Sequence, residues 1–284
     1  MKGLYIHIPF CNSICNYCDF TKLVSSDEVK TKYVDRLLQE IDHYEDELKN
    51  INTVYIGGGT PNSLSLKLLK KIFKKIDKYL DESIESSIEL NPELINIDLI
   101  KLLKEYKFNR VSIGVESFNN NILKSINRKH SIDDVFNAIK LLKENGINNI
   151  NIDLMYGLPN QTINDIKTDL DYFYKLEIPH ISYYSLILED KTVFHHLMDN
   201  KKLVLPDDDL VADMYEYISN DLCIHNYNHY EISNYSKKNH ESIHNLIYWN
   251  QEEYVGVGLG ASGFLNHYRY TNNKSMKKYL EEFI

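Results

Sequence analysis

The sequence predicts an α/β fold, in which a parallel β-sheet is covered by helices. Between Leu4 and Leu222, six short β-rich apolar segments alternate with amphipathic segments of helical period. Ser, Thr or Asp precedes several helical segments, as is typical of helix N-caps. With 284 residues and 43% hydrophobic content, the chain could hold one large core or two. The spacing alone leaves an open doubly wound sheet and a barrel as alternatives.

The six expected strands are short apolar runs, and most end next to Gly, Pro or a polar residue. They lie at residues 4–9, 53–56, 87–90, 110–115, 150–155 and 181–188. In parallel sheets, ligands bind at the C-terminal ends of the strands. The Gly57-Gly-Gly-Thr-Pro61 segment, Glu89, Glu116 and Asp153 follow or end four different strands. We therefore expect these residues on one rim of the sheet.

Six helices are expected between and after the strands. Ser26, Ser131, Thr162 and Asp207 are read as N-caps, and Asp165 stands at the capping-box position after Thr162. The apolar positions of these helices lie within residues 29–48, 69–80, 99–106, 135–142, 166–173 and 210–222. One helix following each strand is the pattern of repeated β–α units.

Charge and hydropathy narrow the class of protein. The net charge is −9 and the isoelectric point about 5.7, which argues against general nucleic-acid binding through a basic surface. No run of 18 apolar residues is present, so no transmembrane segment is expected. Clustered cysteines without a secretory signal indicate a reducing cytoplasm, with peripheral membrane association left open.

Three of the four cysteines, Cys11, Cys15 and Cys18, are clustered near the N-terminus with C-x3-C-x2-C spacing. Three thiolates can ligate three irons of a [4Fe–4S] cluster and leave the fourth iron open to a small molecule. An open metal position is typical of catalytic rather than structural sites. Two alternatives remain: a zinc site completed by His7 or a remote histidine, and unligated cysteines that serve as small apolar residues.

The residues around the cysteines carry a family resemblance. Tyr5-x-His7-x-Pro9-Phe10-Cys11-x3-Cys15-x-Tyr17-Cys18-x-Phe20 resembles the radical S-adenosylmethionine (SAM) superfamily. Within it, the segment is similar to the oxygen-independent coproporphyrinogen III oxidase-like family and its haem chaperone branch, HemW. The resemblance extends from Tyr5 to about Phe264 and implies a [4Fe–4S] cluster, SAM and haem as cofactors. In this superfamily a reduced cluster cleaves SAM to methionine and a 5′-deoxyadenosyl radical.

The resemblance also implies a domain organisation. Residues 1–200 would form a partial (β/α)6 radical SAM barrel with the cluster loop at its N-terminus. Residues 201–284 would form a smaller α+β C-terminal region. Family members generally continue into a further C-terminal domain, whereas this sequence ends in a helical stretch with no stop signal. The chain is therefore expected to be truncated.

By resemblance, SAM contacts are assigned to residues that follow or end successive strands. These are Tyr5, Tyr17, Gly58, Gly59, Thr60, Glu89, Glu116, Arg128 and Asp153. Glu116 departs from the family, which usually has Gln there. An ionised carboxylate only accepts hydrogen bonds, so a ligand oxygen that needs a donor would lose it at Glu116.

The segment His244-Asn-x-x-Tyr248-Trp249 is similar to a motif of the haem chaperone branch and contains the only tryptophan. Imidazole is a common ligand of haem iron, so His244 is the candidate haem residue. An ordinary structural histidine is the alternative. The glycines of Gly256-x-Gly258-x-Gly260 lack the spacing and the β–α–β context of a dinucleotide fingerprint.

Two main functions follow from the resemblance. The first is a haem chaperone that binds haem, the cluster and SAM and delivers haem to unidentified haem proteins. The second is an oxygen-independent coproporphyrinogen III dehydrogenase that makes protoporphyrinogen IX. Phe20 favours the first, because the oxidases have a further cysteine at that position, and the short N-terminus favours it too. A cluster-containing binding module without catalysis is a third possibility. The expected partners are haem or porphyrin, haem-accepting proteins and an electron donor for the cluster.

Overall fold

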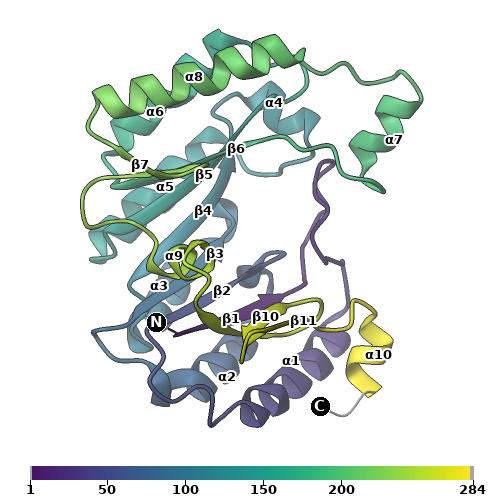
Figure 1. Ribbon diagram of the computed structural model, residues 1–284, viewed down its shortest axis with the longest axis vertical. Helices are drawn as coiled ribbons and strands as arrows, with labels where there is room; N and C mark the ends of the chain where they lie inside the picture. The colour runs from purple at the N-terminus through teal and green to yellow at the C-terminus, as the bar shows by residue number, and fades with distance from the viewer. Residues whose placement is uncertain (1, 282–284) are drawn as a thin grey trace.

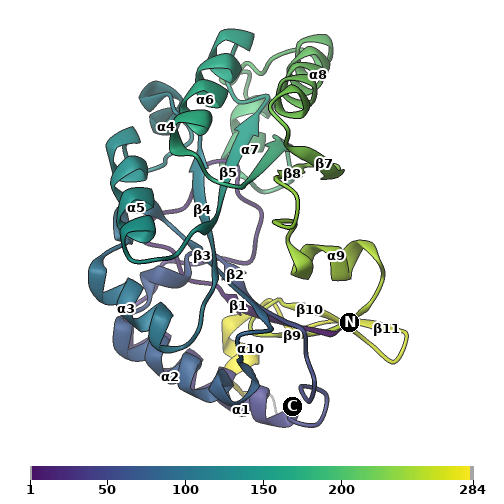
Figure 2. The same ribbon diagram turned by 90° about the vertical axis from the view of Figure 1, so that its left-hand side faces the viewer.

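The structure is a computed structural model that describes residues 2–281 (Figures 1 and 2). One mixed sheet contains strands from both halves of the chain, in the order β11-β10-β9-β1-β2-β3-β4-β5-β6-β8-β7. The strands are β1 (Lys2–Ile8), β2 (Thr53–Gly58), β3 (Glu85–Leu90), β4 (Arg110–Glu116), β5 (Asn149–Tyr156), β6 (His180–Ser185), β7 (Asn228–Glu231), β8 (Asn234–Ser236), β9 (Glu253–Val257), β10 (Ser262–Leu265) and β11 (Tyr268–Thr271).

Helices follow each of the first six strands and cover one side of the sheet (Figure 2). They are α1 (Asp27–His43), α2 (Leu66–Ile76), α3 (Ile97–Glu105), α4 (Asn120–Ser125), α5 (Ile132–Glu144), α6 (Ile163–Leu176), α7 (Val193–Asp199), α8 (Asp208–Ile224), α9 (Ile243–Trp249) and α10 (Met276–Glu281). The predicted caps Ser26, Ser131, Thr162 and Asp207 are all N-caps whose side chains accept a backbone N–H.

Strands β1 to β6 are consecutive and parallel, which confirms the predicted α/β fold of repeated β–α units. The sheet curves but does not close. Within the described residues, the free edge of β1 pairs in parallel with β9, and that of β6 pairs antiparallel with β8. The result is a partial barrel with an open side, and helix α9 lies at that open side (Figure 2).

The two faces of the central strands differ in chemistry because side chains alternate along a strand. On β4, Val111, Ile113 and Val115 are fully buried toward the helices. Arg110 and Ser112, on the opposite face, point into the barrel. The same alternation recurs on β1, β2, β5 and β6. The convex face therefore holds the apolar core, and the concave face presents polar groups to the interior.

Some predicted boundaries were wrong. Helix α1 ends at His43, so Leu48 lies in the following turn, although it is buried as expected. Strand β6 ends at Ser185 rather than at residue 188. The strands β7 to β11, within residues 228–271, join the main sheet and complete its two edges. The division at residue 200 stays a proposal. Among residues 2–281, no helix is long and apolar enough to cross a membrane.

Candidate functional site

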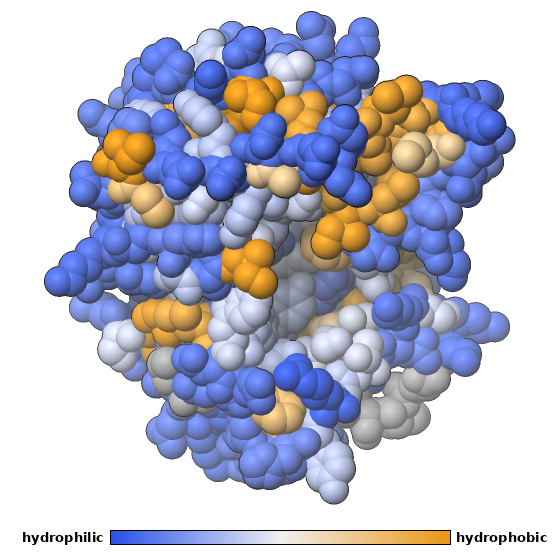
Figure 3. Space-filling view, turned by 45° about the horizontal axis from the view of Figure 1, so that its top comes forward, coloured by the Kyte–Doolittle hydropathy of each residue, from blue (hydrophilic) through white to orange (hydrophobic). Residues whose placement is uncertain are grey.

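The concave face encloses a cavity of about 510 Å³ at the C-terminal rim of the strands. In the space-filling view this face is hollowed near its centre, with apolar side chains in orange along part of the rim (Figure 3). The sequence-predicted residues that line the cavity are Cys11, Cys15, Tyr17, Cys18, Gly58, Gly59, Thr60, Glu89, Glu116, Arg128 and Asp153. Tyr5 and His244 are not among the lining residues.

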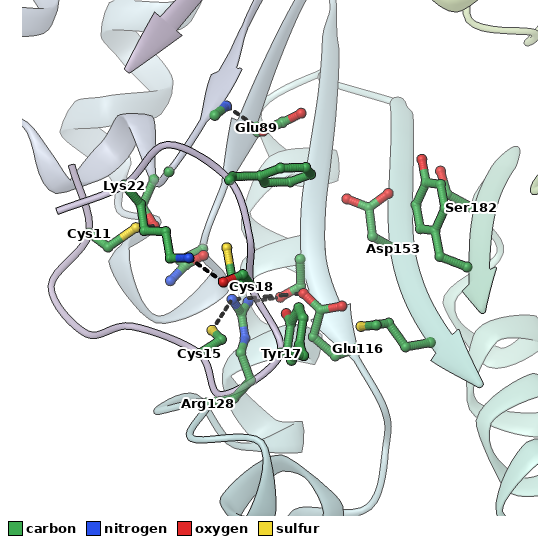
Figure 4. A pocket seen from close by; sticks show the side chains of 18 of the residues that line it. Cys11, Cys15, Tyr17, Cys18, Lys22, Glu89, Glu116, Arg128, Asp153 and Ser182 are labelled. Atoms are coloured by element: carbon green, nitrogen blue, oxygen red, sulfur yellow. Dashed lines mark hydrogen bonds and ion pairs between the residues drawn. The ribbon is translucent and has the colours of Figure 1, made fainter. Parts of the chain in front are cut away.

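The three cysteines lie on one loop that leaves β1 and crosses the mouth of the cavity (Figure 4). A bridge between Phe10 and Leu23 closes this loop at its base, where the Cys11 N–H donates to the Leu23 carbonyl at 3.1 Å. Its far side is anchored near α4, where the Asn16 N–H donates to the Ile126 carbonyl at 3.1 Å. Backbone contacts therefore hold the loop both at its base and at its far side.

Cys11, Cys15 and Cys18 are free thiols of intermediate burial that face the cavity. Burial raises the pKa of Cys18 to about 11 and also raises the pKa of Cys11, although the Lys22 ammonium favours the thiolate of both. Metal binding would displace these protons. Three thiols around one opening suit a [4Fe–4S] cluster that leaves one iron open to a ligand in the cavity.

The zinc alternative lacks a fourth ligand near the cysteines. Both ring nitrogens of His7 are engaged: Nδ1 with the Tyr5 hydroxyl at 3.0 Å and Nε2 with the Thr21 carbonyl at 2.8 Å. Within residues 2–281, no three His, Cys, Asp or Glu side chains are placed to share a single metal ion. His7 instead bonds the backbone of the cluster loop, which makes it a support for that loop.

The glycine loop after β2 lets functional side chains approach the backbone closely. Gly58 has φ +116°, and a Cβ atom there would lie 2.5 Å from the His7 ring. A Cβ atom on Gly59 would lie 2.9 Å from the Cys11 sulfur. The Thr60 hydroxyl contacts the same sulfur at 3.5 Å, and its N–H donates to the Phe10 carbonyl at 2.7 Å. The loop therefore packs directly against the first cysteine.

Glu89 is held at the end of β3 by two donors. The Tyr55 hydroxyl donates to Oε1 at 2.8 Å, and the Gly58 N–H donates to Oε2 at 3.0 Å. Burial, together with the nearby Asp153 carboxylate, raises the pKa of Glu89 to about 7. Near neutral pH, an additional cation in the cavity would stabilise the ionised form of Glu89.

Glu116 and Arg128 form a second charged group at the rim (Figure 4). Glu116 has φ +67° at a bulge between β4 and β5, in a region that side chains other than glycine seldom adopt. Its Oε1 lies 3.8 Å from Nη1 of Arg128, which also contacts the Cys15 sulfur at 3.9 Å. Burial raises the pKa of Glu116 to about 7, although Arg128 favours its charged form. The predicted arginine therefore lies beside the cluster loop.

Asp153 points into the cavity from β5, and each oxygen of its buried carboxyl group accepts a hydrogen bond. The Ser112 hydroxyl donates to Oδ2 at 3.0 Å, and the Asn151 amide donates to Oδ1 at 2.8 Å. Burial raises the pKa of Asp153. Asn151 continues the network, because its Oδ1 contacts His180 Nδ1 at 2.6 Å. Both oxygens of Asp153 are thus committed to neutral neighbours.

His244 lies at the first turn of α9 and is fully buried. Its Nδ1 contacts the Thr53 hydroxyl at 2.7 Å, and its Nε2 contacts the Tyr248 hydroxyl at 2.7 Å. The ring stacks on Tyr55 at 5.1 Å between centroids, and Tyr55 in turn holds Glu89. In this conformation neither ring nitrogen is available to iron, so His244 does not fit as a direct haem ligand without movement of α9.

The rest of the motif divides between the interior and the surface. Asn245 lines the cavity, whereas Trp249 is 52% exposed. Tyr5 stacks on Tyr55 at 6.2 Å, so it supports the wall behind Glu89 instead of lining the cavity.

Several lining residues were not predicted from the sequence. The polar ones include Lys22, Arg110, Asn151 and Ser182, and the apolar ones include Ile14, Phe20 and Ile187. The available signal was polar residues at alternate positions of otherwise apolar strands, such as Arg110 and Ser112 on β4 or Asn151 and Asp153 on β5. From the sequence, Phe20 was significant only because the oxidases have a cysteine at that position. In the structure its side chain is 62% exposed.

Comparison with known proteins agrees with this geometry. The family model of the radical SAM superfamily matches residues 5–173. The Heme chaperone HemW of Lactococcus lactis subsp. lactis (strain IL1403) is 43% identical over 99% of this chain and 74% of its own length. The Heme chaperone HemW of Bacillus subtilis (strain 168) is 40% identical over 99% of this chain and 76% of its own length.

Among solved structures, the coproporphyrinogen III oxidase HemN from Escherichia coli, described as a radical SAM enzyme, has the same fold. Its TM-score is 0.85 at 24% identity, over 99% of this chain and 68% of the HemN chain. At this identity the likeness shows the fold alone. The family match and the two HemW relatives show more: this chain belongs to the radical SAM superfamily and, within it, to the coproporphyrinogen III oxidase-like family that includes the HemW proteins.

Proposed function

We propose that this protein is a haem chaperone that binds a [4Fe–4S] cluster, SAM and haem and delivers haem to haem proteins. The names of the HemW relatives support the haem part of the proposal. The observation that carries the cofactor part is the single cavity that gathers three cysteines, the glycine loop, Glu89, Glu116, Arg128 and Asp153. We propose the cytoplasm as its location, where clustered thiols stay reduced.

In this proposal Cys11, Cys15 and Cys18 hold the cluster, and SAM occupies the cavity beside it. When bound and reduced, the cluster supplies one-electron chemistry to SAM. The Glu89 and Asp153 carboxylates attract a cationic ligand, and Arg128 at the rim attracts its carboxylate. Tyr17 packs at the same rim, where burial raises the pKa of its hydroxyl so that it stays neutral. The electron donor for the cluster is a separate partner.

The apolar mouth of the cavity supports a large apolar ligand over a small polar one. Phe20 and Ile187 are 62% and 68% exposed, and both line the cavity. Exposed apolar side chains gathered at a cavity are typical of a binding surface. Direct ligation of haem iron by His244 stays a prediction that requires loss of its contacts with Thr53 and Tyr248.

The first test is a visible-absorption titration of the anaerobically reconstituted protein with haemin, followed by addition of an apo-haem protein. A saturating Soret shift that then moves to the acceptor supports the chaperone. No shift, together with SAM-dependent conversion of coproporphyrinogen III to protoporphyrinogen IX, overturns it in favour of the dehydrogenase. A reconstituted protein without iron contradicts the cluster.

Two variants test the role of His244. The His244→Ala variant shows whether the Soret shift needs the imidazole. The Tyr248→Phe variant removes the hydroxyl that occupies Nε2, so it should increase haemin affinity if His244 ligates the iron and leave it unchanged if another residue does. The cluster absorbance of both variants serves as the control for correct folding.

A further inference from the structure

Arg110 is a buried cation without a partner. It begins β4, is only 2% exposed and lines the cavity. Among residues 2–281, its guanidinium makes no hydrogen bond or ion pair, and its Nε is buried and unsatisfied. Arginine stays protonated in proteins, and an unpaired buried charge is costly. An anionic group of a ligand could supply both the missing hydrogen-bond acceptor and the missing counter-charge.

The carboxylates near Arg110 are already engaged. The charge of Arg110 slightly favours the ionised forms of Glu89 and Asp153, so both lie within electrostatic reach. Glu89, however, is bonded by Tyr55 and Gly58, and Asp153 is bonded by Ser112 and Asn151. Neither pairs with the guanidinium.

The remaining neighbours offer Arg110 no anion either. His180 and His244 are fully buried, and burial, together with Arg110, lowers the pKa of each, so both are neutral. Glu85 on β3 faces the same region, but its two oxygens accept the N–H groups of Ile243 and His244. The anion that would complete Arg110 must therefore come from outside the chain.

The two cavity arginines are anchored at different depths along β4. The Arg128 guanidinium donates to the Gly114 carbonyl, four residues beyond Arg110 on β4. At about 3.3 Å per residue, roughly 13 Å of strand separates that carbonyl from the Arg110 backbone. Arg128 contacts the Cys15 sulfur at 3.9 Å, so it would lie near a ligand of the cluster. Arg110 starts from the deeper end of the strand, where it could bind a different group of a ligand.

We propose that Arg110 binds a carboxylate of a second ligand, and that this group is a propionate of the tetrapyrrole. The inference rests on the proposed haem function. The wall of the same cavity contains Tyr55, Tyr184 and Met155 beside the polar groups. Such a wall suits an apolar body with a carboxylate arm, because Arg provides a planar, charge-assisted donor for the arm.

The test compares haemin with its dimethyl ester, in which both propionates are neutral, on the parent, Arg110→Met and Arg110→Lys. We expect the parent to bind haemin more tightly than the ester. Arg110→Met should weaken haemin binding about tenfold to hundredfold, the usual effect of losing a charged hydrogen bond, and leave the binding of the ester unaffected. Arg110→Lys should restore part of the haemin affinity.

Three outcomes would overturn the inference. Haemin affinity unchanged in Arg110→Met would place the propionates elsewhere. A loss of SAM affinity with haemin unchanged would assign Arg110 to the SAM carboxylate. A lower melting temperature of ligand-free Arg110→Met would show that the guanidinium supports the fold, whereas an unpaired charge predicts an equal or higher one. Because this last measurement needs no haem, it tests Arg110 even if the parent fails to bind haemin, a result that would contradict the proposed function instead.

Discussion

The two faces of the central sheet are made from the same strands but have different roles. On the convex face, residues such as Val111, Ile113 and Ile152 are fully buried against helices and have no polar side-chain groups. On the concave face, burial raises the pKa values of Glu89 and Asp153 because it disfavours their charged forms. Arg110 on the same face is a buried charge with an unsatisfied Nε. The first face stabilises the fold, and the second holds polar groups ready for ligands at some expense of stability.

The largest effect should come from the convex face of β4. Ile113→Ala removes a fully buried side chain and should lower the free energy of unfolding by about 2–5 kcal/mol. Ser112→Ala, the matched change on the concave face, removes a hydroxyl that bonds Asp153 and Asn151 and should cost about 1 kcal/mol. Urea unfolding of the two variants measures the difference. Equal decreases in the free energy of unfolding would contradict the idea that the convex face contributes more to stability than the concave face.

A concave hydroxyl should affect ligand binding more than stability. Tyr55→Phe removes the donor to Glu89, so SAM should bind about ten to a hundred times more weakly, as for loss of a hydrogen bond to a charged group. Tyr183→Phe is the control, because the Tyr183 hydroxyl faces Asp169 on the helix side. Equilibrium dialysis with SAM measures both variants. A similar loss of SAM affinity in Tyr183→Phe would show that removing a buried tyrosine hydroxyl perturbs the cavity indirectly, through the fold.

The pH dependence of SAM binding should follow the concave carboxyls. Burial raises the pKa of Glu89 to about 7, so its ionised form grows as the pH rises through that value. A cationic ligand favours the ionised form, and SAM affinity should therefore increase between about pH 6 and pH 8, by at most tenfold per unit. Glu89→Gln should flatten the profile. Glu116 titrates in the same range, so Glu116→Gln is the comparison. A flat profile in the parent would refute the role of both carboxyls.

A separate pH effect, on stability instead of ligand binding, concerns a carboxyl on the convex side of the sheet. Asp169 on α6 is fully buried, and burial raises its pKa to about 7. Between about pH 4 and pH 7 the native state keeps a proton that the unfolded chain has released, so stability should fall as the pH rises, by at most about 1.4 kcal/mol per unit. Asp169→Asn should remove this contribution while those of Glu89 and Glu116 remain. Urea unfolding across the same pH range measures it, and an unchanged slope would contradict the assignment.

The parts of the fold that the sequence predicted are those with local signals. The side chains of Ser26 and Thr162 cap α1 and α6, as expected from residues a few positions away. The strands β7 to β11 were missed because they are short, and because β9 and β8, which attach them to the sheet, pair with β1 and β6, which are distant in sequence. A local pattern carries no information on such partners.

The candidate site shows the same limit. The cysteine motif and the glycine loop pointed to residues that the fold gathers around one cavity, because strand ends of a parallel sheet meet at one rim. The motif also selected His244, but not its surroundings: Thr53, which contacts Nδ1, is 191 positions away in the chain. Arg110 was overlooked because one polar residue in a strand is unremarkable until its missing partner is seen.

The pairing of β9 with β1 has a consequence for biosynthesis. The strand that leads into the cysteine loop has one edge that is completed only when Glu253–Val257 leaves the ribosome. At 5–20 residues per second, this edge stays open for roughly 10–50 s during translation. An open strand edge is a site of mispairing and aggregation, so the nascent chain has reason to be shielded during that interval. Iron–sulfur assembly on a correctly seated loop is therefore expected after translation has passed Val257, and a nascent chain arrested earlier should not retain the cluster.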